Sequence, residues 1–228
     1  MRVAVVQIGA LRLTGRAAVA ATLTLLVAIL AALIYFRARI LSSPLSISAA
    51  LWIAFVVNWS VAASKTASAP TQSRESRESR RVHQRLLNLA MLLVFVPVPG
   101  LDRRILPAGS WVVVLGIAIQ VASFGLAIFA RRHLGRFWSG EITRKVGHEL
   151  IRSGPYRFVR HPIYTAMLGM FVGMAIVSGD LHAFVGAAVV TFAYWRKIRL
   201  EEKNLSELFG ASYDEYRRTT RGLIPWVF

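Results

Sequence analysis

Long apolar runs alternate with short segments that carry nearly all of the charge, and this segregation dictates what the chain can fold into. Of its 228 residues 55% are hydrophobic, yet its formal net charge is +17. A soluble domain rarely combines these two properties. Six runs approach the ~20 apolar residues that a membrane-spanning helix needs, and they cover 17–36, 44–63, 86–99, 109–130, 162–178 and 181–198.

The pattern predicts an all-α, polytopic integral membrane protein with five to six transmembrane helices and a C-terminal cytosolic amphipathic segment. The run at 86–99 is the weakest, because it is short and ends in Pro97 and Pro99. We expect a tilted, broken or re-entrant helix there. The first run follows Arg12 and Arg16 as a signal peptide would, but its length favours an uncleaved anchor.

The distribution of Lys and Arg predicts the orientation. With six spans and a cytoplasmic amino terminus, 24 of the 28 Lys/Arg residues fall on the cytoplasmic side and four on the other. Such a bias is a strong positive-inside signal. It predicts a multi-pass membrane protein with both termini and the active site on the cytoplasmic side. Because the basic residues follow topology rather than gathering in one basic domain, no nucleic-acid partner is expected.

The sequence predicts that the chain divides into two regions. Residues 1–108 form N-terminal membrane helices with a hydrophilic linker at 64–85, whose repeated Arg-Glu-Ser indicates a short solvated helix or disorder. Residues 109–228 form a core with the polar motifs and a terminal helical hairpin, in which the spacing of Gly169 and Gly173 allows close packing. The chain has no cysteine, which excludes disulfides and thiolate metal sites within it. No metal is expected.

The motif with the most chemistry precedes the apolar run at 162–178. Pro162 marks a helix start, and this leaves Arg160 and His161 in the non-helical approach to it. Two cationic or hydrogen-bonding side chains beside unpaired backbone N–H groups favour a carboxylate or a phosphate. Glu201 and Glu202 are placed where a helix leaves the bilayer, and they are expected to face back toward this pair.

Several short motifs in order resemble the isoprenylcysteine carboxyl methyltransferase family, which is similar to the phospholipid N-methyltransferases. The resemblance covers roughly 125–228, with Thr165-Ala166 where the family often has glycine. The matching residues are Leu134-Gly135, Trp138-Ser139, His148-x-Leu150, Gly154-Pro155-Tyr156, Arg160-His161-Pro162-x-Tyr164, Glu201-Glu202-x-x-Leu205, Phe209-Gly210, Tyr213, Tyr216 and Ile224-Pro225.

The resemblance implies an S-adenosyl-L-methionine-dependent methyltransferase that binds its methyl donor from the cytosolic side. The residues suit that molecule, since Arg160 and His161 can bind its carboxylate and Glu202 its ammonium, while Tyr156 or Tyr164 can flank the sulfonium or the adenine. His148 is expected at the ribose or an amino-acid oxygen. The expected cofactor-binding set is His148, Leu150, Gly154, Tyr156, Arg160, His161, Pro162, Tyr164 and Glu202.

The expected acceptor is a hydrophobic or lipid-like small molecule that enters between the helices, with a carboxylate as one candidate nucleophile. Arg196 or Arg199 would orient a carboxylate, and Glu201 or Glu202 would take the proton of an amine. Arg196, Arg199 and Glu201 are therefore the predicted catalytic residues, and membrane lipids the other partners. Two alternatives stay open, namely an NAD(P)H-dependent membrane reductase of the sterol-reductase kind and a non-catalytic lipid-binding membrane protein.

Overall fold

The apolar runs and the motif segments fold into long helices. The computed structural model describes residues 44–66, 71–73, 75–139, 142–145, 147 and 149–223, all within one compact unit. The predicted span 17–36, His148 and Ile224-Pro225 lie outside the described residues. The helices are α3 (Pro44–Thr66), α4 (Arg77–Phe95), α5 (Ser110–Leu134), α6 (Pro162–Ser178), α7 (Leu181–Phe209) and α8 (Ala211–Thr219).

Short elements connect the helices on the side where the motifs lie. Two single turns of 3₁₀ helix, η1 (Gly135–Phe137) and η2 (Gly154–Arg157), follow α5. Strands β1 (Thr71–Ser73) and β2 (Thr143–Lys145) pair antiparallel over three residues. All other regular elements among the described residues are helices, in agreement with the predicted all-α class.

Two of the helices are long and apolar enough to cross a membrane, over Pro44–Ala63 and Ser110–Phe137, and Pro162–Ser178 is a shorter apolar helix. Only 22% and 28% of the apolar windows in the two long helices are buried inside the protein. Exposed apolar side chains such as Val114 and Phe129 therefore face outward, as lipid-facing residues do and core residues of a soluble domain do not.

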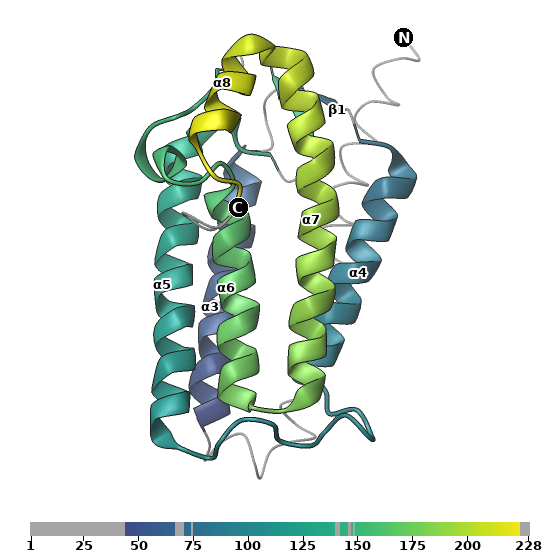
Figure 1. Ribbon diagram of the computed structural model, residues 1–228, viewed down its shortest axis with the longest axis vertical. Coiled ribbons are helices and arrows are strands. Elements are labelled where there is room, and N and C mark those ends of the chain that lie inside the picture. The colour runs from purple at the N-terminus through teal and green to yellow at the C-terminus, as the bar shows by residue number, and fades with distance from the viewer. Residues whose placement is uncertain are drawn as a thin grey trace. The chain divides into compact units, whose positions relative to one another are not determined.

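The helices pack in a regular order. Helix α5 lies along α6, α4 lies along α7, and α6 and α7 form the predicted hairpin, with α3 against α5 and α6 (Figure 1). The turn of the hairpin contains Gly179 in the left-handed conformation, with φ of 72°. Glycine adopts this conformation without the strain that a Cβ atom brings.

Small residues allow α5 and α6 to approach closely. A Cβ atom on Gly173 would lie 2.6 Å from Cγ of Gln120 and 2.7 Å from the carbonyl oxygen of Gly116. Gln120 is fully buried, accepts a hydrogen bond from the Ser48 hydroxyl at 2.6 Å and donates to the Met170 carbonyl at 3.4 Å. The predicted close packing at Gly173 is confirmed, and Gln120 joins α5 to both α3 and α6.

Helix α4 does not have the predicted bounds. The helix begins at Arg77, inside the expected linker, because the Ser76 hydroxyl accepts a hydrogen bond from the backbone N–H of Ser79 and caps it. It ends at Phe95 because Pro97 cannot continue a helix. The apolar run predicted at 86–99 is therefore only the second part of a longer helix that ends four residues earlier, and residues 77–85 of the expected linker form its first turns, in agreement with the helical alternative given for that linker.

The α5–α6 contact gives a test of the packing. Gly173→Ala should lower the free energy of unfolding by about 1–3 kcal/mol, since the added methyl meets the backbone of α5. The matched control is Gly125→Ala on α5, whose added Cβ meets nothing within 4 Å and which should be neutral or stabilise the helix by up to ~1 kcal/mol. Thermal unfolding of the purified protein in detergent measures both. Equal melting temperatures for the two variants would contradict the close packing.

Candidate functional site

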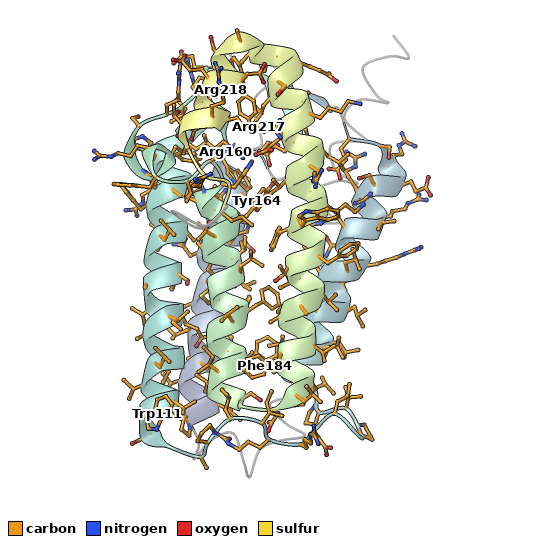
Figure 2. The ribbon with its side chains drawn as sticks, viewed as in Figure 1. Trp111, Arg160, Tyr164, Phe184, Arg217 and Arg218 are labelled. Carbon is orange, nitrogen blue, oxygen red and sulfur yellow. The ribbon has the colours of Figure 1, made fainter. Side chains whose placement is uncertain are left out.

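The motif residues gather around a cavity at one end of the helices. Figure 2 shows Arg160, Tyr164 and Arg217 toward the end that α8 occupies, away from Trp111 and Phe184. The cavity has a volume of about 360 Å³, within the range of ~300–1,000 Å³ usual for small-molecule sites. Its walls come from Trp59 of α3, from α4, α6, α7 and α8, and from described residues of the connection between α5 and α6.

A buried ion pair between Arg160 and Glu202, with His161 beside it, lies at the end of the cavity near α8. Arg160 and His161 line the cavity, whereas Glu202 does not. Nε and Nη2 of Arg160 donate to Oε1 of Glu202 at 2.9 and 2.7 Å, and Nε2 of His161 lies 3.2 Å from the same oxygen. The side chains of Arg160 and Glu202 are only 11% and 13% exposed. Although burial by itself raises the pKa of Glu202, the hydrogen bonds from His161 and Arg160 lower this pKa to about 2. The predicted approach of Glu202 to Arg160 and His161 is thus present.

Local backbone structure holds this cluster in place. Pro162 is the first residue of α6. The two residues before it are held by the segment after α8, because the backbone N–H groups of Arg160 and His161 donate to the carbonyls of Arg221 and Gly222. Nη1 of Arg160 also donates to the carbonyls of Arg217 and Thr220. Arg160 therefore joins the start of α6, the outer part of α7 and the end of α8.

Glu201 and Tyr164 form a second contact beside the ion pair. The Tyr164 hydroxyl donates to Oε2 of Glu201 at 2.8 Å, and Nδ1 of His161 lies 4.0 Å from that oxygen. The Tyr164 ring stacks between His161 and Tyr194, with centroid distances of 5.7 and 5.0 Å. Tyr164, His161 and Glu201 all line the cavity.

The segment before α6 supplies the remaining predicted cofactor residues. Tyr156, Pro162 and Leu150 line the cavity, and the Tyr156 hydroxyl donates to the Ala130 carbonyl at 3.4 Å. Gly154 has φ of 59° and packs on His133, whose ring atoms would lie 2.6–2.8 Å from an added Cβ. It shapes the turn η2 and does not line the cavity.

Arg196 and Arg199 do not line the cavity with the other predicted residues. Nη2 of Arg196 donates to the Ser79 hydroxyl at 3.0 Å and Nη1 to the Ser79 carbonyl at 3.3 Å, so that this arginine joins α7 to α4. Arg199 is exposed and lies over the Trp195 ring, 4.9 Å from its centroid. The acceptor role predicted for these two arginines stays a prediction.

Several cavity residues were not predicted. On α7 the cavity face is formed by Tyr194, Lys197, Glu201 and Asn204, whose spacing of three and four residues is that of one helix face. Counting back four residues from Glu201 reaches Lys197 and not Arg196 or Arg199. The helical spacing alone could therefore have identified Lys197 as the basic residue on the face of Glu201. His83 of α4 also lines the cavity. It lies in the segment that the sequence had marked as a hydrophilic linker.

Comparison with known proteins agrees with the motifs. Residues 109–212 match the phospholipid methyltransferase family. Methanethiol S-methyltransferase 1 of Bradyrhizobium diazoefficiens is 39% identical over 71 residues, 31% of this chain and 24% of that protein. Protein-S-isoprenylcysteine O-methyltransferase B of Arabidopsis thaliana is 28% identical over 132 residues, 57% of this chain and 64% of that protein. The protein-S-isoprenylcysteine O-methyltransferase of Schizosaccharomyces pombe is 31% identical over 88 residues, 37% and 36% of the two chains.

Helices with exposed apolar surfaces and a cavity lined by charged, aromatic and apolar residues at one end form a candidate small-molecule site, and the named relatives are methyltransferases. The carboxyl-terminal part of the chain is thus similar to phospholipid methyltransferases and to protein-S-isoprenylcysteine O-methyltransferases, which confirms the resemblance seen in the motifs. These matches support the prediction that the chain is an enzyme of the methyltransferase class. The chain spans between 24% and 64% of the length of the three relatives described.

The lowered pKa of Glu202 predicts how stability depends on pH. A carboxylate whose pKa falls on folding stabilises the fold above its unfolded pKa, and this contribution is lost as the pH falls from about 4.5 to about 2. Glu202→Gln should lower the melting temperature at pH 7, and its difference from the parent should shrink in that acidic window. Melting curves from pH 7 to pH 3 test this. Glu207→Gln, at an exposed position of the same helix, is the control and should show a small, constant difference.

Proposed function

We propose that this chain is an S-adenosyl-L-methionine-dependent membrane methyltransferase that acts on an apolar acceptor. The observation that carries the proposal is the cluster of Arg160, His161 and Glu202, of which Arg160 and His161 line one end of the cavity and Glu202 is paired with both of them. It offers cationic donors for a carboxylate and an anion for an ammonium group, which are the two charged groups of the donor's amino-acid end.

The residues present fit such a donor. The Tyr213 side chain is 1% exposed and lines the cavity, yet its hydroxyl has no hydrogen-bond partner within the part of the chain that the structure describes. A buried hydroxyl without a partner is costly, so that a polar ligand group in the cavity would supply what it lacks. The rings of Tyr164 and Tyr156 provide faces for the sulfonium or the adenine.

In this assignment the chain's own groups bind and orient the reactants. Arg160 and His161 would hold the donor's carboxylate, Glu202 its ammonium, and Leu150 and Pro162 would supply apolar lining. His148 remains a proposed contact to the ribose or an amino-acid oxygen. The donor, when bound, supplies an electrophilic methyl group on a sulfonium. The apolar and aromatic walls of the cavity then favour transfer to an anionic acceptor, since the reacting pair loses charge and fixed dipoles position it.

The relatives' names include both an S-methyltransferase of methanethiol and O-methyltransferases of isoprenylcysteine, so we propose a thiol or a carboxylate attached to an apolar group as the acceptor. Access from the lipid phase between helices suits such a molecule. We also propose the multi-pass topology described above, with both termini and the site on the cytoplasmic side. In this view residues 1–108 contribute membrane helices, and residues 109–228 the donor site.

Binding of S-adenosyl-L-methionine tests the proposal directly. Arg160→Ala and Glu202→Gln should each weaken binding by about 1.5–3 kcal/mol, the usual range for a hydrogen bond to a charged group. Isothermal titration calorimetry on purified protein in detergent measures this, with thermal unfolding to verify that the variants fold. Arg157→Ala is the control, because Arg157 is exposed and lies over the ring of Phe158.

NADPH added to the same preparation separates the reductase alternative. We expect saturable binding of S-adenosyl-L-methionine by the parent and no saturable binding of NADPH. Binding of NADPH alone would overturn the methyltransferase assignment in favour of the reductase. Saturable binding of neither compound would favour the non-catalytic lipid-binding protein.

A further inference from the structure

A second polar cluster lies where α4 meets α7. Nζ of Lys197 is 3.5 Å from Oε2 of Glu75, and these side chains are 8% and 1% exposed. Oε1 of Glu75 accepts a hydrogen bond from the Ser79 hydroxyl at 2.8 Å, which in turn accepts from Arg196. His83, one turn beyond Ser79 on α4, is 8% exposed. Four ionisable groups are thus held together at a site that the cofactor motifs do not include.

His83 is the member of this cluster that can still bind a ligand. Its Nδ1 is buried and has no hydrogen-bond partner within the described residues. Its ring lines the cavity, as does Lys197. A buried nitrogen without a partner carries a free-energy cost, and a ligand group that donates a hydrogen bond to it would remove that cost.

A continuous row of rings connects this cluster with the proposed donor site. His83 meets Tyr194 edge to face, with ring centroids 5.6 Å apart. Tyr194 stacks on Tyr164, and Tyr164 stacks on His161. All four residues line the same cavity. The cavity therefore has the ion pair of Arg160 and Glu202 near one end of the row and the cluster of His83 and Lys197 at the other.

We propose that His83, with Lys197 and Glu75, forms the acceptor end of this cavity, where Nδ1 of His83 accepts the proton of a small apolar thiol as that thiol is methylated. The inference rests on the proposed methyl transfer. The cavity of about 360 Å³ is near the lower end of the usual range, so that little room remains beside a bound donor and a small acceptor fits best.

The chemistry distinguishes a thiol from a carboxylate. A carboxylate is already ionised at pH 7 and needs no base, whereas a thiol with a pKa of about 8.5 is mostly protonated. The thiol sulfur forms a bond to the methyl carbon of the S-adenosyl-L-methionine sulfonium while the bond from that carbon to the sulfonium sulfur breaks. The S–H proton passes to Nδ1 of His83 and then to water. The products are a methyl thioether and neutral S-adenosylhomocysteine.

The surroundings of His83 keep its imidazole able to accept a proton. Burial lowers its pKa, the nearby charges of Lys197 and Arg196 lower it further, and Glu75 and the Ala193 backbone raise it, so that the pKa is about 4. The ring is therefore neutral at pH 7. A weak base is sufficient here, because the S–H group becomes strongly acidic once its sulfur begins to bond to the methyl carbon.

The test compares two acceptors in His83→Asn, which keeps a hydrogen-bonding group near the position of Nδ1 but cannot hold the proton. With 1-butanethiol at pH 7, kcat should fall about 100-fold, the lower end of what a positioned base contributes. The loss should diminish as the pH rises toward the thiol's own pKa, since thiolate then forms without help. With pentanoate, an acceptor of similar size whose carboxylate needs no base, the rate should change less than about 2-fold.

Two further measurements check that the variants fold and that the thiol binds near His83 when no donor is present. His83→Gln serves as a second variant, and thermal unfolding verifies that each variant folds. Histidine side chains labelled with ¹⁵N report binding without donor. The resonance of Nδ1 of His83, identified by its loss in His83→Asn, should shift when 1-butanethiol is added. His133→Gln is the matched control, because glutamine can retain the bond that Nε2 of His133 makes to the Ser153 hydroxyl at 2.8 Å.

The possible failures are distinguishable. A parent protein that binds no S-adenosyl-L-methionine would refute the proposed function, and the inference with it. A parent that binds the donor and methylates only the carboxylate would refute the inference alone. The same conclusion follows if His83→Asn methylates 1-butanethiol at the parental rate, or if the Nδ1 resonance does not respond to the thiol.

Discussion

The buried ion pair between Arg160 and Glu202 is the interaction on which the rest of the site depends. Arg160 precedes α6, Glu202 lies on the outer part of α7, and the same guanidinium binds the carbonyls at the end of α8. Removing one partner of such a pair leaves an uncompensated buried charge, which costs more than the pair itself contributes. The pair therefore fixes three segments relative to one another, and it leaves His161, Tyr164 and Glu201 facing the cavity.

The cavity separates two kinds of chemistry along one row of aromatic rings. The permanent charges of Arg160 and Glu202 stand at one end, where a zwitterionic ligand can be bound. At the other end His83 is neutral, and the charge of Lys197 is balanced by Glu75. Tyr194 and Tyr164 lie between them. In the proposed function, donor and acceptor are recognised by different groups, and the row of rings provides a common apolar wall.

Backbone chemistry made much of this arrangement predictable. Pro162 specified the start of α6, Gly179 the turn of the hairpin and Gly210 the end of α7, because each residue restricts or relaxes φ at a helix boundary. Glu202 could be expected near Arg160 and His161, since charged groups at one membrane face converge on one another. Helices were predicted wherever an apolar run was long.

The cluster around His83 could not be predicted in the same way. The first turns of α4 are polar and lack an apolar period, so that hydropathy marked Glu75, Ser79 and His83 as linker. Their burial results from the packing of α4 along α7, which local sequence does not encode. Which basic residue of α7 lines the cavity depends on which face of that helix is turned toward the cavity. Lys197 shares the face of Tyr194 and Glu201, and this register becomes clear only when one residue of the face is known.

An experimental structure of the protein with S-adenosylhomocysteine bound tests the central claim most directly. The account predicts the carboxylate within hydrogen-bonding distance of Arg160 or His161 and the ammonium beside Glu202, with the sulfur inside the cavity that Tyr164 lines. A ligand bound outside this cavity, or bound in it with its amino-acid end away from Arg160 and Glu202, would contradict the account.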